Sequence, residues 1–224
     1  MESTLAPSTR PEAIDQLLNS VERYNPDNVE VLEEYLNTQC QHEENDLAAN
    51  LAILKLYQFN PHLINLAALV RILGKALTNF FEADFNLCLY LLNEGVVQEE
   101  VVVKLLELKQ AVEESNFGQF WQLLDNPEYR ELVADIHNFD GAMRSTISHV
   151  VGMAYQTMDL KLAEQYFHLE GEPLKQWLDQ LKWTIEGSIV QIPANQDNQV
   201  EPTVTTESIQ FSQLTKIIGH SSAV

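Results

Sequence analysis

One segment constrains the fold of this chain more than any other, the run DLAANLAILKLYQFNP from Asp46 to Pro61. Wound as an α-helix at about 100° per residue, it directs apolar side chains toward most of its circumference. The polar residues share one narrower sector, which holds Asn50, Lys55 and Gln58. A helix that is apolar over so much of its surface needs neighbours on several sides. We therefore predict that this helix is interior.

The same segment carries signals for its own ends. Asp46 is a candidate N-cap, because its carboxylate can accept a hydrogen bond from a free N–H of the first turn. Asn60 precedes a proline and is pushed out of the helical region, so the helix should end there. The residues from His62 to Leu77 are again apolar at helical spacing, and the two helices are expected to form a tight hairpin. Within the hairpin, Leu51 and Leu54 should be fully buried.

Apolar residues at helical spacing continue on both sides of the hairpin. They predict further helices over residues 11–24, 29–36, 85–92, 101–112, 117–124, 132–139 and 142–158. Gly95 is expected to close the helix over residues 85–92, because glycine accepts the backbone conformation that ends many helices.

Successive helices with short connections favour a stacked helical array over residues 11–158. The first two of three Asn-Pro breaks, at Asn25 and Asn60, lie 35 residues apart. This distance falls within the period of about 34 to 47 residues found in helical-hairpin repeats. The polar residues 1–10 in front of the array are expected to be disordered.

The pattern changes after Met158. Two short helical patterns, 160–169 and 173–181, are joined through Gly171. The following run WTIEGSIVQIP alternates in polarity, is rich in β-branched residues and has Gly187 at a turn, which is typical of strands. Another strand is expected over Val204–Thr206. Short helices followed by a two-stranded ribbon predict a winged helix-turn-helix module over residues 159–207.

The last segment, residues 208–224, contains a short amphipathic helix over Ser208–Gly219 and a polar tail. A helix this short gains little from propensity and must pack against something. One interpretation places it on its own winged helix near Trp177 and Trp183, and the other on a partner protein. The candidate partner-binding residues are Phe211, Leu214, Ile217 and Ile218.

Charge decides what the winged helix is expected to bind. The 224-residue chain has a net charge of −20, which repels phosphate backbones. From Leu160 to the end, the chain has four lysines, no arginine and eight acidic residues. The expected recognition helix, 173–181, carries one lysine and one aspartate instead of residues that read bases or neutralise phosphates. We therefore expect the module to bind protein and not to bind nucleic acid directly.

Sequence motifs for catalysis and metal binding are missing. The chain contains no phosphate-binding glycine loop, no Cys-x-x-Cys, no His-Glu-x-x-His and no Gly-x-Ser-x-Gly. Cys40, His42, Glu43 and Glu44 come closest to a ligand cluster, but adjacent positions on a helix point in different directions. His149 lies in an apolar run and is expected to be a core histidine. We therefore expect no enzyme activity, no cofactor and no metal.

Cellular location follows from the cysteines and from hydropathy. Cys40 and Cys88 both lie in amphipathic helical patterns, which predicts buried free thiols in a reducing compartment. No window approaches the ~18 to 20 unbroken apolar residues of a membrane span. The first residues lack the basic start and apolar core of a secretion signal. The expected location is the cytoplasm, with no membrane contact.

Several segments taken together resemble a known family. Their order along the chain is ERYNP (22–26), NLAILKLYQFNP (50–61), GKALTN (74–79), DFNLCLYLL (84–92), SNFGQFWQLLD (115–125), HVVGMAYQ (149–156) and IQFSQLTKIIG (209–219). In this order they are similar to the subunit K family of eukaryotic translation initiation factor 3. The segment LYQFNP is the most specific of them, and the others are mainly core patterns.

The resemblance implies a HEAT-like helical array followed by a winged helix, related to the PCI modules of the initiation factor, the proteasome lid and the signalosome. It implies no catalytic residues. Such subunits belong to the PCI/MPN core of the factor, which binds the small ribosomal subunit, with subunit L as the expected neighbour. It also favours a partner for the C-terminal helix, because PCI subunits associate through winged helices and bundle their C-terminal helices.

The function expected from residues and resemblance together is that of a non-enzymatic scaffold subunit of translation initiation factor 3. Two alternatives stay open. One is a nucleic-acid-binding winged-helix protein, which would show steeply salt-dependent binding to RNA. The other is a free-standing helical adaptor for a basic partner, for which the acidic surface would be the docking face.

Overall fold

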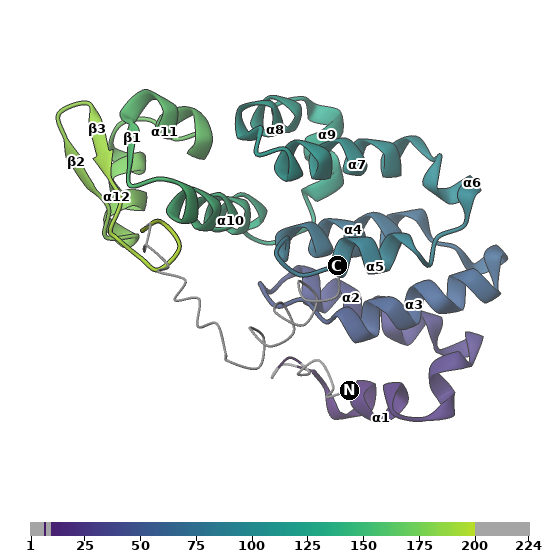
Figure 1. The fold of residues 1–224 in the computed structure, drawn as a ribbon. Coiled ribbons are helices and arrows are strands. Elements are labelled where there is room, and N and C mark those ends of the chain that lie inside the picture. The colour runs from purple at the N-terminus through teal and green to yellow at the C-terminus, as the bar shows by residue number, and fades with distance from the viewer. Residues whose placement is uncertain (1–6, 8–9, 200–224) are drawn as a thin grey trace, which may run out of the picture.

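The computed structural model describes residue 7 and residues 10–199, and the structural statements below concern these residues. Helices α1–α9 form a stacked array, the long helix α10 leads away from it, and α11, α12 and a small sheet form a separate module (Figure 1). The helices are α1 (Glu12–Leu18), α2 (Val29–Cys40), α3 (Leu47–Phe59), α4 (Leu66–Thr78), α5 (Asp84–Leu89), α6 (Glu94–Val97), α7 (Glu100–Glu113), α8 (Phe117–Leu124), α9 (Pro127–Val133), α10 (Phe139–Ala154), α11 (Leu160–Phe167) and α12 (Glu172–Gln180). The 3-10 turns are η1 (Val21–Tyr24), η2 (Pro26–Asn28) and η3 (Pro61–Leu63), and the strands are β1 (Thr157–Asp159), β2 (Thr184–Glu186) and β3 (Ile189–Gln191).

Helix α3 is the interior helix that the sequence predicts. Ile53 and Leu54 are 0% exposed, and α3 contacts α1, α2, α4 and α5. Its N-terminus is capped as expected, because the Asp46 carboxylate accepts a hydrogen bond from the Ala49 N–H at 3.1 Å. It ends at Phe59, directly before the Asn-Pro break.

Two side chains of α3 differ from expectation. Leu51 is partly rather than fully buried, because it borders a groove beneath α1. Asn50, expected in the outer polar sector with Gln58, is 1% exposed. Its amide oxygen accepts a hydrogen bond from Gln39 Nε2 at 3.2 Å, and its amide nitrogen donates one to Asn45 Oδ1 at 3.0 Å. A buried amide is tolerated here because its polar atoms have partners.

Asp46 also holds the start of the described chain. Its two carboxylate oxygens accept hydrogen bonds from the Arg10 guanidinium at 2.6 and 2.7 Å, and the Tyr35 hydroxyl donates to the same carboxylate at 3.1 Å. The hydrogen bond to Asp46 raises the pKa of Arg10, and burial raises the pKa of Tyr35. A buried bidentate pair of this kind fixes geometry as well as adding energy. The expected disorder of residues 1–10 is therefore wrong for Arg10, while residues 1–6, 8 and 9 lie outside the described part.

Helix α4 starts later than its apolar pattern predicts. Residues Pro61–Leu63 form η3, and α4 begins at Leu66 because the Asn65 side chain accepts a hydrogen bond from the Ala67 N–H at 3.1 Å. The helix packs against α2, α3, α5, α7 and α9, so it runs through the middle of the array. A β-carbon at Gly74 would lie 2.5 Å from Ile136 Cδ1, so glycine permits this close approach to the segment after α9.

The first helix is shorter than its pattern. It ends at Leu18, and Val21 and Tyr24 lie in η1, where they are 81% and 47% exposed instead of packed on a helix face. The cause is local, because the Ser20 hydroxyl accepts a hydrogen bond from the Glu22 N–H at 3.2 Å and starts a new turn.

The later part of the array differs from its pattern at three places. Gly95 lies within α6, and the preceding helix α5 already ends at Leu89. Residues 132–139 are not one helix, because Asn138 takes a left-handed backbone conformation (φ 52°) directly before α10. Met158, expected at the end of a helix, belongs to strand β1.

Residues 157–191 have the element order of a winged helix, β1, α11, α12, β2 and β3, with α10 in front. Strand β3 pairs antiparallel with both β1 and β2, which gives the sheet order β1-β3-β2. Gly187 forms the expected turn between β2 and β3 with φ 66°, a conformation that glycine adopts without steric cost. The mainly helical fold with a small terminal α/β module, predicted from the sequence, is confirmed. The further strand expected over Val204–Thr206 lies outside the described residues.

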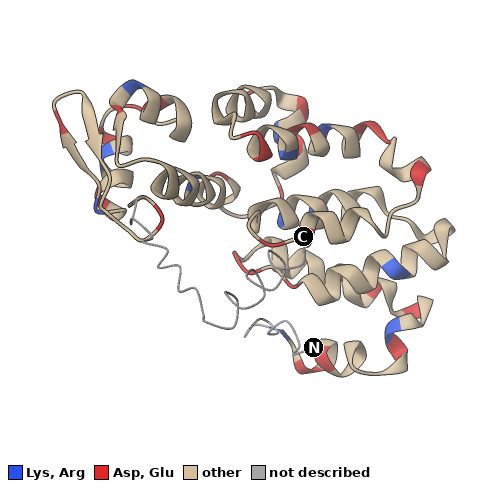
Figure 2. Cartoon of the chain, in the orientation of Figure 1, with Lys and Arg blue, Asp and Glu red and all other residues tan. Residues whose placement is uncertain are grey.

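Acidic residues outnumber basic ones over the ribbon, and the basic ones are widely separated (Figure 2). Most basic side chains of the array are held by carboxylates. Lys104 bridges Glu100 and Glu128 at 2.7 Å each. The other pairs within the array and α10 include Arg71–Asp135, Lys109–Glu113 and Arg130–Asp140. These exposed pairs contribute little stability each, but they leave few cations free for other partners.

Candidate protein-interaction site

The partner-binding residues expected from the sequence, Phe211, Leu214, Ile217 and Ile218, lie outside the described residues. Their role stays a prediction. The structure does describe the winged-helix module that precedes them in the sequence.

Helix α12 occupies the position of a recognition helix in this module. Its inner face is formed by Leu174 and Leu178, which are 1% and 0% exposed, and by Trp177, whose Nε1–H donates a hydrogen bond to Ser148 Oγ of α10 at 3.1 Å. The one cation on its outer face, Lys175, lies 3.8 Å from the Glu172 carboxylate of the same helix. The outer face therefore offers phosphate groups a single lysine with a carboxylate beside it, and no cluster of cations.

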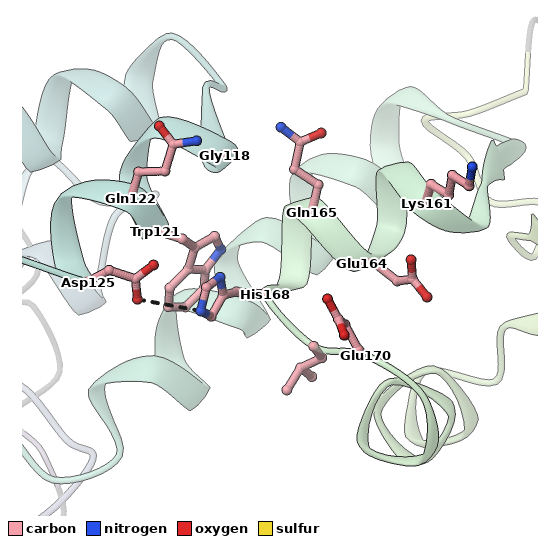
Figure 3. A pocket seen from close by; sticks show the side chains of 10 residues that line it. Gly118, Trp121, Gln122, Asp125, Lys161, Glu164, Gln165, His168 and Glu170 are labelled. Atoms are coloured by element: carbon pink, nitrogen blue, oxygen red, sulfur yellow. Dashed lines mark ion pairs between the residues drawn. The ribbon is translucent and has the colours of Figure 1, made fainter.

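A cleft of about 470 Å³ lies between α8 of the array and α11 of the module. Figure 3 shows the rings of Trp121 and His168 lying against each other, with Asp125 on one side and the carboxylates of Glu164 and Glu170 on the other. The residues that line it include no serine, threonine or cysteine, so it has no hydroxyl or thiol nucleophile. Its lining combines four carboxylate or imidazole side chains and a tryptophan ring with Gln122, Gln165 and Lys161.

His168 joins the two sides of this cleft. It ends α11 in the left-handed region (φ 50°), and its ring stacks on Trp121 with centroids 5.5 Å apart and planes 20° apart. Its Nε2 lies 3.5 Å from Asp125 Oδ1, an ion pair when the imidazole is protonated. Both side chains are about half exposed, so this pair is screened and weak.

Two stronger contacts fix the end of α11 below that stack. Trp121 Nε1–H donates a hydrogen bond to the Tyr166 carbonyl at 2.8 Å, and Arg144 Nε donates one to the Phe167 carbonyl at 2.9 Å. The last carbonyls of a helix have no partner within it, so these donors satisfy groups that would otherwise be left open. The Arg144 guanidinium also lies 5.1 Å from the centre of the Trp121 ring, and burial lowers the pKa of Arg144. Array and module are thus joined by partly buried, directional hydrogen bonds.

The segment around Cys40, His42 and Glu43 is held in place by a buried lysine. Lys75 is 1% exposed and donates hydrogen bonds to the His42 and Glu43 carbonyls at 2.7 and 3.2 Å, so the segment after α2 is tied to α4 through its backbone. Cys40 is a buried free thiol, and so is Cys88. Over the described ranges, no three His, Cys, Asp or Glu side chains are grouped to hold a metal ion. No helix within those ranges is long and apolar enough to cross a membrane.

His149 is not the core histidine expected from its apolar run. It is exposed on α10, and its ring meets Phe81 edge to face with centroids 4.5 Å apart. The apolar pattern around it belongs to the neighbouring positions, because Ile147 and Val151 are the buried apolar residues on that stretch.

The junction between array and module was not visible in the sequence. The pattern of SNFGQFWQLLD correctly placed Phe117, Phe120, Trp121 and Leu124 on one buried face of α8. Helical periodicity indicates which side chains are buried. It does not indicate that the Trp121 indole N–H donates to the Tyr166 carbonyl, or that Arg144 donates to the Phe167 carbonyl.

Comparison with known proteins shows where this architecture belongs. The profile described as the CSN8/PSMD8/EIF3K family matches residues 64–204, which include most of the array and the whole described module. Proteins named eukaryotic translation initiation factor 3 subunit K are similar along nearly the entire chain. That of Bombyx mori is 38% identical, with 98% of this chain and 99% of the relative covered. Those of Homo sapiens and Phaeosphaeria nodorum are each 36% identical, covering 93% of this chain and 95% and 93% of the relative. With this identity over more than nine-tenths of each chain, the protein belongs to the subunit K group of the CSN8/PSMD8/EIF3K family.

Proposed function

We propose that the chain is a non-enzymatic scaffold subunit of eukaryotic translation initiation factor 3 in the cytoplasm. In this role it contributes protein–protein contacts to the PCI/MPN core that binds the small ribosomal subunit. Its partners are the other subunits of the factor, and it reaches the ribosome through the assembled complex. Membership of the subunit K group supports this assignment.

The observation that carries the scaffold role is the outer face of α12. In a winged helix that binds DNA, the recognition helix presents side chains to base edges and phosphates. Here that helix presents Lys175 paired with Glu172, together with the acidic Asp179. The module thus has the fold of a winged helix but lacks the basic side chains that bind nucleic acid. This combination supports a module that docks on protein.

The neighbour that we propose is subunit L, in contact with the winged helix and with the C-terminal helix over residues 208–219. The helical spacing of Phe211, Leu214, Ile217 and Ile218 in the sequence supports this proposal, because an apolar stripe on the short helix that it predicts requires a surface to pack on. Packing on its own module is the alternative. Trp177 and Trp183, the surface considered for it, are respectively half-buried and 6% exposed.

Purification through a tag on this chain, followed by native mass spectrometry, tests the assignment. We expect the masses of the other factor subunits in the complex, and subunit L in the smallest subcomplex that retains the tagged chain. Purification of the chain alone, or with proteins unrelated to translation, would refute the assignment. Retention of the tagged chain in subcomplexes without subunit L would refute the neighbour alone.

A nucleic-acid-binding role is the competing function, and salt dependence separates it from the scaffold role. Binding through phosphate contacts weakens steeply as salt concentration rises. Fluorescence anisotropy of a labelled single-stranded RNA and a labelled duplex, titrated with the isolated chain at two salt concentrations, should show negligible binding at physiological salt. Tight binding that falls steeply with salt would favour the competing function.

A further inference from the structure

A groove of about 290 Å³ lies at the other end of the molecule from the winged helix, between α1, η1 and α3. It is lined by the apolar residues Leu18, Ala48, Leu51 and Ala52, with the exposed ring of Tyr24 beside them. This groove is the reason that Leu51 stays partly open on a helix that is otherwise interior.

The cations at this groove differ from those elsewhere in the array. The charge of Arg10 is already taken up by Asp46 and Asp15. Among the described residues Arg23 binds only the neighbouring Tyr24, donating to its hydroxyl at 2.6 Å and lying 4.6 Å from the ring centre. Lys55 has no hydrogen-bond or ion-pair partner within residue 7 and residues 10–199.

Two uncompensated cations are unexpected in a chain with a net charge of −20, where carboxylates are plentiful. The nearest acidic residue in η1, Glu22, binds the side-chain amides of Asn25 and Asn28 instead, at 3.1 and 3.3 Å. The groove therefore combines an apolar lining with positive charge that nothing in the described chain neutralises.

We propose that this groove is a docking site for an acidic amphipathic segment of a partner protein. Apolar side chains of that segment would enter between α1 and α3, and its carboxylates would bind Arg23 and Lys55. Amphipathic segments of partner proteins commonly bind by laying their apolar face into a hydrophobic groove. Charge-assisted hydrogen bonds from arginine and lysine to carboxylate supply the selectivity.

Other occupants match the groove less well. A nucleic acid binds through many phosphate contacts, and two cations on a strongly acidic chain do not provide them. The apolar segment 208–219 of this chain has one lysine and no carboxylate, so its charge is opposite to the one that the groove requires. A separate, acidic polypeptide satisfies both the apolar lining and the charge.

Photo-crosslinking in the assembled factor tests this inference, which rests on the proposed function because it uses the complex. Tyr24→p-benzoylphenylalanine places the reactive ketone at an exposed aromatic position of the groove, and it replaces the hydroxyl to which Arg23 donates. We expect a crosslink to one segment of another polypeptide, identified by mass spectrometry as apolar and rich in Asp or Glu.

Charge reversal supplies the second arm of the test. Arg23→Glu with Lys55→Glu, added to the crosslinking variant, should reduce the crosslink yield by about tenfold or more, the effect expected from losing charge-assisted hydrogen bonds. The control is Lys182→Glu, which reverses an exposed lysine between α12 and β2 and should leave the yield unchanged. Thermal unfolding of each variant confirms that the chain remains folded.

The remaining outcomes are distinct. Copurification with the factor without any crosslink overturns the docking site while leaving the proposed function intact, whereas failure to copurify overturns the proposed function. A crosslink to residues 200–224 of the same chain, to a second copy or to RNA overturns the assignment of an acidic protein partner. A yield that charge reversal does not change overturns the role of Arg23 and Lys55.

Discussion

Asp46 illustrates how much a single residue does in this fold. Its carboxylate caps α3, accepts the hydroxyl hydrogen of Tyr35 and forms a bidentate pair with Arg10, while its backbone N–H donates to Gln39 Oε1 at 2.9 Å. Sequence pattern revealed the cap, because a cap depends on the next few residues. The partners on α2 and on the chain before α1 lie too far away in sequence to produce a pattern.

The burial of Leu54 leads to the first prediction. Leu54→Ala should lower the free energy of unfolding by about 2 to 5 kcal/mol, because the emptied site leaves a cavity in a packed interior. Urea denaturation measures the change. The control is Val31→Ala on the exposed side of α2, which is 47% exposed and should change stability by less than about 0.5 kcal/mol. Equal effects of the two variants would show that α3 is not interior.

Cys88 gives a prediction about pH. Burial raises the pKa of the Cys88 thiol from 9.0 to about 12, so the folded state keeps the proton that the unfolded state loses first. Its contribution to stability is complete below pH 9.0 and is lost as pH rises toward about 12. In Cys88→Ala the free energy of unfolding should therefore fall less steeply above pH 9.0 than in the unchanged protein.

The control for Cys88 is Val112→Ala, which removes buried apolar atoms without removing a titrating group. It should lower stability at every pH and leave the slope unchanged. Denaturant titrations at a series of alkaline pH values measure both slopes. The same slope in Cys88→Ala as in the unchanged protein would contradict the prediction.

Among the elements, the sequence predicted the positions of most helices and missed the places where local bonds override periodicity. Phe117–Leu124 was placed correctly because its apolar face repeats at helical spacing. Val21 and Tyr24 follow the same spacing, but the Ser20 side chain starts a separate turn and leaves them exposed. Strand β1 was missed because three residues that pair with β3 are too few to show alternation.

Asn50, Leu51 and His149 show the same limit for single side chains. A helical pattern reports the average direction of a face, but it does not tell whether a polar residue at the edge finds a buried partner, as Asn50 does. It also does not show that a groove opens at Leu51 or that His149 faces solvent beside Phe81. These outcomes depend on neighbours that come from other helices.

The C-terminal helix expected over residues 208–219 is tested by a chain that ends at Glu207. If the helix serves assembly, the truncated chain should keep its thermal unfolding temperature and lose subunit L in a pull-down. If it completes the module, the truncated chain should unfold or aggregate instead. Truncation without effect on stability or association would show that the segment has neither role.

At the scale of the whole molecule, charge decides which partners are accessible. The net charge of −20 gives the isolated chain a long-range repulsion toward phosphate backbones. Lys175→Ala with Lys182→Ala should therefore leave recruitment of the assembled factor to the small ribosomal subunit nearly unchanged. Sedimentation of the factor with ribosomal subunits measures recruitment, and a marked loss would show that these lysines contact RNA.

The anchoring of the last described residues has a consequence for assembly. Asn198 donates hydrogen bonds from its side-chain amide to the carbonyls of Gly152, Tyr155 and Pro193, at 3.0 to 3.2 Å. The chain beyond residue 199 therefore departs from a fixed point at the end of α10. A partner that holds both this departing segment and the winged helix binds the second contact at a high effective concentration. Two contacts that are each weak can then give a long-lived complex through avidity. Cleaving the chain between the winged helix and the segment after residue 199 would shorten the lifetime of that complex without altering either contact surface.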